Sequence, residues 1–276
     1  MKKSIINVLF IGDIVGQAGQ NILTKELPGL KEKYSVDFTI VNGENAAAGK
    51  GITQDEAKTI FDAGADLITT GNHVWDNWRG KPLLASPANI IRPLNYPQGN
   101  VGKGFTFFDL DEDIKIAVLQ LQGRTYMQTI DCPFKAAEFA LKQHIDGQTN
   151  IVIVDFHADA TAEKISMAWF LDGKVSALLG THTHIPTADA TILPNGTGYI
   201  TDVGMTGPYD SVLGLRKDVA LKRFLLQTPH KYEIADKDPR LCGVFLQIET
   251  STGQTVKIEQ IILPDFERKV SFEANY

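Results

Sequence analysis

The chain has 276 residues, 43% of them hydrophobic, and its formal net charge is −6. An acidic chain offers no broad basic face for a phosphate backbone, so we expect no duplex nucleic acid among its partners. The two cysteines have no CxxC spacing and the first apolar run is too short to cross a membrane, which predicts a cytoplasmic protein with no membrane partner.

Short apolar runs alternate with candidate helices through the first two thirds of the chain. Five of these runs read as buried strands of a largely parallel sheet, because each is rich in Val, Ile or Leu and ends at Gly or a polar cluster. They cover residues 7–12, 38–43, 66–71, 150–156 and 175–181.

Three helices are predicted between these strands. Thr53 and Glu56 have the spacing of a capping box, which predicts a helix that starts there and ends at Gly64. Amphipathic spacing predicts further helices over residues 133–144 and 161–171.

Antiparallel strand pairs are predicted where two apolar runs flank a short turn. The pairs are 104–110 with 114–121, 191–193 with 198–201, and 241–249 with 256–263, and one more helix is predicted over 217–226. Because no low-complexity linker or internal repeat interrupts the chain, we expect a single domain over residues 1–276 with mixed strands.

Polar side chains follow each of the five buried runs. Since ligands bind outside the carboxyl ends of strands in open α/β sheets, these side chains are expected to converge. Imidazole, carboxylate and carboxamide oxygen together suit Fe, Mn or Zn, and two such ions with a bridging carboxylate can clamp a phosphoryl displacement. The candidate metal ligands are Asp13, Glu44, Asn45, Asn72, His157, His182 and His184.

Each candidate also has an ordinary structural interpretation. Taken alone, Asp13 would be a helix N-cap or turn residue, Glu44 and Asn45 a polar loop, and His157 a hydrogen-bonded loop histidine. Their joint occurrence, in order and each at a strand end, favours the metal interpretation.

The order of these motifs resembles that of the calcineurin-like metallophosphoesterases: Gly-Asp, Gly-Glu-Asn, Gly-Asn-His, a strand-end His and Gly-Thr-His-Thr-His. The stretches GDIVGQAG, VNGENAAAGKGIT, TTGNHVWD and MTGPYDSVLG are similar to the YmdB-like branch, the bacterial cyclic-nucleotide phosphodiesterases. The resemblance covers residues 5 to 264. It implies a four-layer α/β/β/α sandwich of two mixed sheets, a dinuclear metal site, a homo-oligomer and hydrolysis of 2′,3′-cyclic and 3′,5′-cyclic nucleotides.

The chain departs from the wider superfamily in two places. Val15 stands where the Asp-x-His motif has its His, and Glu44 replaces the usual bridging Asp. With Asn45 supplying the missing ligand, the resemblance assigns Asp13, Glu44, Asn45 and His184 to one ion and Glu44, Asn72, His157 and His182 to the other. We expect two divalent or trivalent ions per subunit, with Fe as the first choice and Mn or Mg as alternatives. The ion bound by Asp13 and Asn45 is expected to be the more labile, because it has lost an imidazole ligand.

His73 follows a proposed ligand but is not counted as one. Its position predicts a general acid, because the departing alkoxide of a phosphodiester needs a proton near neutral pH; a satisfied loop histidine is the alternative. Asp76 either orients the His73 ring or caps a helix. Tyr209 either stacks on a base in the substrate pocket or belongs to a structural turn.

The leading hypothesis is a dinuclear metal-dependent hydrolase of small phosphodiesters, with a cyclic nucleotide as its substrate. A phosphomonoesterase or 5′-nucleotidase of the same superfamily is one alternative, since its metal site would contain the same residue types. A non-catalytic, metal-containing regulatory scaffold is the other. His73 argues against the scaffold, because a purely structural site needs no proton donor.

Overall fold

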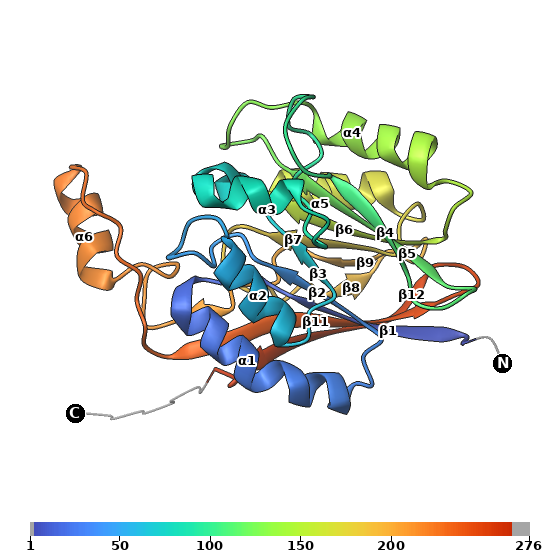
Figure 1. Ribbon diagram of the computed structural model, residues 1–276, viewed down its shortest axis with the longest axis horizontal. Coiled ribbons are helices and arrows are strands. Elements are labelled where there is room, and N and C mark those ends of the chain that lie inside the picture. Colours follow the sequence, from blue (N-terminus) through green and yellow to red (C-terminus); the bar gives the residue numbers. More distant parts are fainter. Residues whose placement is uncertain (1–2, 267–276) are drawn as a thin grey trace, which may run out of the picture.

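Two six-stranded sheets pack face to face and carry helices on both outer faces (Figure 1). This computed structural model describes residues 3–266. The four layers are those of the α/β/β/α sandwich that the sequence resemblance implies. The outer limits of the predicted domain, residues 1 and 276, lie outside the described residues.

The first sheet contains the first three and the last three of the described strands. Its strand order is β10-β11-β1-β2-β3, with β12 paired to β11. Strands β1, β2 and β3 are parallel, and β11 runs antiparallel to β1 on one side and to β12 on the other. The bounds are β1 Ile5–Ile11, β2 Phe38–Asn42, β3 Leu67–Thr69, β10 Gly207–Pro208, β11 Pro239–Glu249 and β12 Thr255–Leu263.

The second sheet is formed by the middle of the chain, in the order β4-β5-β6-β7-β9-β8. Its four inner strands are parallel, whereas β4 and β8 pair antiparallel at the edges. The bounds are β4 Phe105–Asp109, β5 Lys115–Gln122, β6 Ile151–His157, β7 Ala177–Thr181, β8 Thr191–Ile192 and β9 Gly198–Ile200. The five predicted buried runs are therefore strands, divided three and two between the sheets rather than joined in one.

Helices α1 and α2 pack on the first sheet, and α4 and α5 pack on the second, while α6 projects from the body of the molecule (Figure 1). The helical bounds are α1 Gly16–Lys33, α2 Gln54–Asp62, α3 Lys81–Ala85, α4 Pro133–Ala140 with a π-helical turn over Leu141–Ile145, α5 Thr161–Leu171 and α6 Lys217–Leu226. Short 3₁₀ turns cover Asn72–Trp75 (η1) and Trp78–Gly80 (η2). Among residues 3–266, no helix combines the length and apolar character needed to cross a bilayer.

Apolar burial joins the four layers. Side chains from both sheets, including Phe10 and Phe38 on one side and Ile116 and Ile153 on the other, form the central layer. Separate apolar clusters hold the helices to each outer face. Because the two sheets share the central layer, the residues at their strand ends are held at fixed positions relative to one another.

Candidate metal centre

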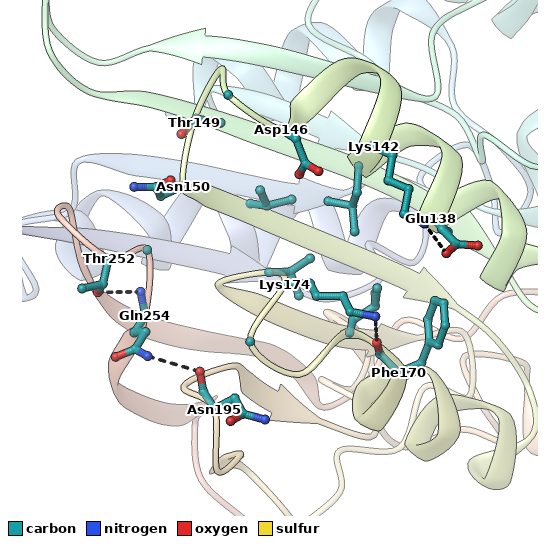
Figure 2. Close-up of a pocket in the computed structure, with 17 residues that line it drawn as sticks. Glu138, Lys142, Asp146, Thr149, Asn150, Phe170, Lys174, Asn195, Thr252 and Gln254 are labelled. Atoms are coloured by element: carbon teal, nitrogen blue, oxygen red, sulfur yellow. Dashed lines mark hydrogen bonds and ion pairs between the residues drawn. The ribbon is translucent and has the colours of Figure 1, made fainter.

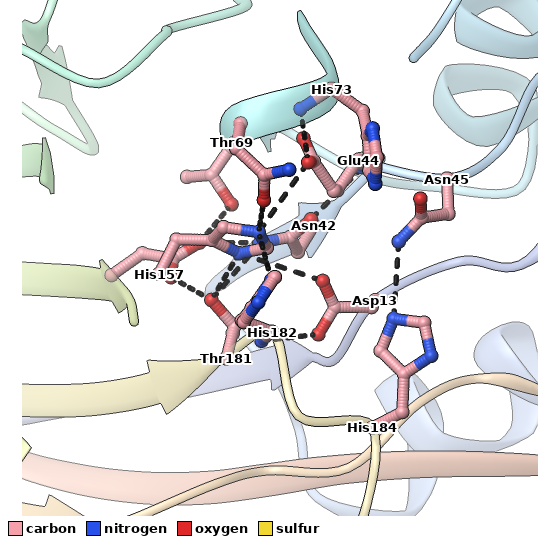
Figure 3. Close-up of polar contacts among 12 residues, drawn as sticks. Asp13, Asn42, Glu44, Asn45, Thr69, His73, His157, Thr181, His182 and His184 are labelled. Carbon is pink, nitrogen blue, oxygen red and sulfur yellow. Dashed lines mark hydrogen bonds and ion pairs between the residues drawn. The ribbon is translucent and has the colours of Figure 1, made fainter. Parts of the chain in front are cut away.

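Side chains from five strand ends meet at one edge of the sandwich (Figure 3). The first sheet supplies those that follow β1, β2 and β3, and the second supplies the end of β6 and the loop after β7. All seven predicted ligands lie in this region: Asp13, Glu44, Asn45, Asn72, His157, His182 and His184. The predicted convergence of these residues is therefore present in the structure.

One group of donor atoms surrounds the imidazole of His157, which is fully buried. Its Nε2 lies 3.0 Å from Asn72 Oδ1, 3.1 Å from His182 Nδ1 and 3.4 Å from Glu44 Oε1. These are the four residues that the sequence resemblance assigns to one ion.

The second group lies beside the first. Asn45 Nδ2 is 3.1 Å from His184 Nε2, and His184 Nδ1 is 3.0 Å from the carbonyl oxygen of Leu213. Asp13 accepts a hydrogen bond from the His182 amide at 3.2 Å and has Oδ1 3.7 Å from His157 Nδ1. Asp13 therefore lies next to the first group, and Asn45 contacts His184.

A buried network beneath these groups orients His157, and the sequence analysis did not identify it. Asp155 accepts hydrogen bonds from Asn42 at 2.9 Å, Thr69 at 2.6 Å and Thr181 at 2.7 Å. Because the Thr181 hydroxyl donates its hydrogen bond to Asp155, its oxygen accepts a hydrogen bond from His157 Nδ1 at 2.9 Å. The lone pair of His157 is then on Nε2, the atom that faces the other donors.

The His182-Thr183-His184 loop has a strained backbone that is held in place by a buried ion pair. The φ angles of His182 and His184 are 96° and 66°, in a region that residues other than glycine rarely adopt. Asp202 accepts from the Thr183 amide at 3.0 Å and from its hydroxyl at 2.7 Å. The ammonium of Lys164 lies 2.7 Å from the same carboxylate, and both side chains are fully buried.

Burial shifts the pKa values of the titratable groups at this edge. Desolvation raises the pKa of Glu44 to about 7 and that of Asp155 to about 8, and it raises the pKa of Asp13. The same cause lowers the pKa of His157 to about 4 and that of His182 to about 2. The protein alone therefore favours uncharged forms, and positive charge at the site would stabilise the carboxylates.

The residues present fit bound metal cations. Asp13 Oδ1 and Glu44 Oε2 are buried without a hydrogen-bond partner, although buried polar atoms are normally paired. With the His157 proton on Nδ1, the lone pair on Nε2 faces the oxygen atoms of Asn72 and Glu44. Lone pairs that face one another repel unless a cation lies between them.

Across residues 3–266, no three His, Cys, Asp or Glu side chains have the spacing of a ready-made ion site. His182 lies directly against His157 and Asn45 against His184, and carboxamides supply part of the donor set.

His73 lies at the rim of the donor groups. Its amide donates to Glu44 Oε1, and its Nδ1 is 2.8 Å from Asp76 Oδ2. Of the two roles predicted for Asp76, the structure supports orientation of the His73 ring, because Asp76 follows η1 rather than preceding it.

A pocket of about 620 Å³ opens onto this edge and is lined by His73, His182 and His184. Tyr209, which was one candidate for a base platform there, is not part of its lining. The Tyr209 hydroxyl lies 3.1 Å from the Met205 carbonyl oxygen and 3.0 Å from Cys242 Sγ. Of the two interpretations of Tyr209, the structure therefore favours the structural turn over the base platform.

A second pocket, of about 460 Å³, lies at the opposite edge, near the amino ends of β6 and β7 (Figure 2). Both of its lysines contact other groups of the wall, since Lys142 lies 2.8 Å from Glu138 and Lys174 donates to the Phe170 carbonyl at 2.9 Å. The predicted ligands lie at the other ends of these strands, so the first pocket is the one associated with the candidate metal centre.

Comparison with known proteins gives relatives over nearly the full length. Residues 9–261 match the family model described as YmdB-like protein. A 2′,3′-cyclic-nucleotide 2′-phosphodiesterase of Bacillus subtilis is 44% identical over 260 residues, which cover 94% of this chain and 98% of the relative.

Two solved structures have the same fold. A hypothetical protein from Thermus thermophilus superposes with a TM-score of 0.87 at 40% identity, covering 93% of this chain and 98% of that one. A protein described as a novel phosphatase, from Mycoplasma pneumoniae, superposes with a TM-score of 0.88 at 34% identity, covering 95% and 94%. From the family match and the identity to these relatives, we conclude that the chain belongs to the YmdB-like family.

Proposed function

We propose that the chain is a metal-dependent phosphoric diester hydrolase whose first substrate class is 2′,3′-cyclic nucleotides. The observation that carries this proposal is the pair of unpartnered, buried carboxylate oxygens of Asp13 and Glu44 among neutral imidazole and carboxamide donors. The name of the Bacillus subtilis relative supports the reaction class.

Two ions would fit the two donor groups, and Glu44 is the residue that we propose to serve both. His157, His182 and Asn72 would hold one ion with Glu44, and Asp13, Asn45 and His184 would hold the other. We expect Fe first, with Mn or Mg as alternatives, and mixed nitrogen and oxygen donors are compatible with such ions. When bound, such ions supply a hydroxide nucleophile at neutral pH and stabilise negative charge on the phosphoryl oxygens.

His73 is the proposed general acid for the departing ribose oxygen. The hydrogen bond from Nδ1 to Asp76 leaves Nε2 as the atom that delivers a proton, and His73 lines the pocket where substrate would enter. Asp76 fixes the orientation of the ring.

The proposal extends to 3′,5′-cyclic nucleotides as a second substrate and to a homo-oligomeric enzyme of the cytoplasm. A phosphomonoesterase is the alternative favoured by a specific observation, since the Mycoplasma pneumoniae structure is described as a phosphatase. The residues at the site fit both reactions, so substrate turnover has to separate them.

The test is a comparison of substrates with the protein loaded with Fe or Mn and its metal content measured by mass spectrometry. We expect about two ions per chain and turnover of 2′,3′-cyclic nucleotides and of bis-p-nitrophenyl phosphate. Cleavage of p-nitrophenyl phosphate alone would favour the phosphomonoesterase. Absence of all turnover from protein containing two ions would favour the non-catalytic scaffold.

A further inference from the structure

The pocket beside the candidate metal centre is larger than a phosphate group needs. Its volume of about 620 Å³ lies within the range that small-molecule ligands occupy in proteins. His73, His182 and His184 line one side of it, and side chains near α6 line another. A phosphodiester bound at the histidines would therefore extend its organic part toward α6.

The wall on the α6 side is apolar. Leu213, Leu215 and Ile234 line it together with Val15. Leu213 is 48% exposed, although it lies in the same pocket as the polar groups of the site. An exposed apolar surface next to a polar centre is typical of a binding site for a ligand with one charged and one apolar end.

Backbone hydrogen bonds fix this wall relative to the histidines. The amide of Ala235 donates to the carbonyl of Gly214 at 2.9 Å, joining the chain before α6 to the chain after it. The carbonyl of Leu213 lies 3.0 Å from His184 Nδ1. The wall and His184 therefore form one rigid unit, so the distance from the phosphate position to the wall is set by the fold.

Tyr232 supplies the phenol ring in this pocket, and it is 47% exposed. The guanidinium of Arg223, from α6, lies 4.1 Å from the ring centroid, while its Nη1 donates to the His230 carbonyl at 2.9 Å. Arg223 therefore holds the ring in place, and the exposed part of the ring remains available to a ligand.

Lys50 connects Tyr232 to the catalytic side of the pocket. Its Nζ lies 5.2 Å from the Tyr232 ring centroid and 3.7 Å from Asp76 Oδ2, the carboxylate that contacts His73. The side chain is half exposed and its contacts are long, so it is free to turn toward an incoming anion.

We propose that this pocket is a nucleoside subsite, in which a planar heteroaromatic base stacks on Tyr232 and the ribose lies along the apolar wall. Lys50 provides a positive charge for the phosphate between the wall and the histidines. The inference rests on the proposed function, because the base reaches Tyr232 only if the phosphate lies at the metal centre. A peptide side chain or a second copy would also cover apolar surface. The position beside His73, where the leaving ribose oxygen would lie, favours the nucleoside.

The test compares two cyclic phosphates that differ only in the base: a 2′,3′-cyclic nucleotide and 1-deoxyribose 2,3-cyclic phosphate. We expect the metal-loaded wild type to have the higher kcat/KM for the nucleotide. Tyr232→Ala should reduce this preference about tenfold or more, mainly through KM, because stacking contributes to binding of the base. Tyr232→Trp should restore most of it.

Trp169→Ala is the matched control, since Trp169 is an exposed aromatic residue of α5 and does not line this pocket. It should keep the wild-type preference, and thermal melting should show that the Tyr232 variants are folded. A Tyr232→Ala enzyme with the wild-type preference would overturn the subsite alone. A wild type that cleaves neither cyclic phosphate would instead overturn the proposed function, and the subsite with it.

Discussion

The orientation of the His157 imidazole depends on a buried hydrogen-bond network beneath it. Asp155 accepts a hydrogen bond from the Thr181 hydroxyl, and that hydroxyl accepts one from His157 Nδ1. The buried carboxylate therefore determines that Nε2, without a proton, is the nitrogen that faces the centre. Glu44 has no equivalent partner for its second oxygen. At the scale of single residues, hydrogen bonds within the protein orient the imidazole donor, whereas the second carboxylate oxygen of Glu44 has no protein partner and would be paired by a cation.

Replacement of His73 tests its role as the general acid. His73→Ala should lower kcat on a cyclic nucleotide by about 100- to 10,000-fold, because a positioned proton donor contributes this much. The content of metal ions should stay at the wild-type value. His144→Ala, which removes an exposed histidine from the π-helical turn, should leave kcat unchanged. Wild-type turnover by His73→Ala would remove His73 from the mechanism.

The raised pKa of Glu44 predicts how the stability of metal-free protein depends on pH. Its pKa is about 7 in the folded protein and 4.5 ordinarily, so the folded state keeps a proton that the unfolded state has already released. The free energy of unfolding should therefore fall as pH rises from about 4.5 to 8, by on the order of 3 kcal/mol from this group.

Glu44→Gln isolates that contribution, because the amide does not titrate. Urea unfolding of both metal-free proteins from pH 4.5 to 8 should show that the difference between them grows with pH and levels off above 7. Parallel pH profiles for the two proteins would contradict the shifted pKa of Glu44.

The predicted and the missed residues of the site differ in a simple physical way. The seven candidate ligands follow apolar runs, so each is recognised in the sequence as a polar residue at the end of a predicted strand. Asn42 and Asp155 lie inside strands, and Lys164 lies in a helix, so their sequence positions look like those of solvent-facing residues. Only the packing of β2 against β6 brings the Asn42 amide to the Asp155 carboxylate, and sequence spacing contains no information on that distance.

At the scale of elements, the loops after the strands are short and closely packed. Gly71 joins β3 to η1, and a Cβ atom there would lie 2.3 Å from the ring of His157. No side chain fits without moving the imidazole. The glycine is therefore needed for the geometry of the centre, although its own φ of −157° is available to any residue.

Gly71→Ala should reduce metal affinity and lower kcat/KM at least tenfold, because His157 has to shift away from Asn72 and Glu44. Isothermal titration with Mn²⁺ and turnover of a cyclic nucleotide measure the two effects. Gly29→Ala is the control: Gly29 lies in α1 with open space around it, so alanine should raise stability by about 1 kcal/mol and leave turnover intact. Equal metal affinity in Gly71→Ala and wild type would contradict the packing argument.

Most elements were predictable because their patterns are local. The capping box at Thr53 is present, and the helices over 161–171 and 217–226 have the predicted bounds. Helix α1 was not among the predictions, and its sequence explains why, since it contains Pro28 and several glycines and has no acidic residue in its first turn. The division of the parallel strands between two sheets also lacks a local signal.

At the scale of the whole molecule, the candidate centre joins the two sheets. Asp13, Glu44 and Asn72 follow strands of the first sheet, whereas His157 ends a strand of the second sheet and His182 follows one. Bound ions would therefore cross-link the two halves of the sandwich, and their binding would stabilise the folded state in proportion to their affinity.

Chelation of metal should lower the melting temperature. At a free ion concentration of about 100 times the Kd, binding contributes about 2.7 kcal/mol, so the expected shift is on the order of 5 °C or more. Differential scanning calorimetry before and after chelation measures the shift, and adding Mn²⁺ back should reverse it. The Glu44→Gln protein should show a much smaller shift. A wild-type melting temperature that is the same with and without metal would contradict a link between the sheets.

The position of β1 has a consequence for when the protein becomes active. Strand β1 lies between β2 and β11, so its two neighbours come from distant parts of the sequence. A growing polypeptide cannot complete the sheet beneath Asp13 until β11 has emerged from the ribosome. Hydrolysis would therefore begin only after β11 has been synthesised, and shortened products of translation that lack β11 would be inert.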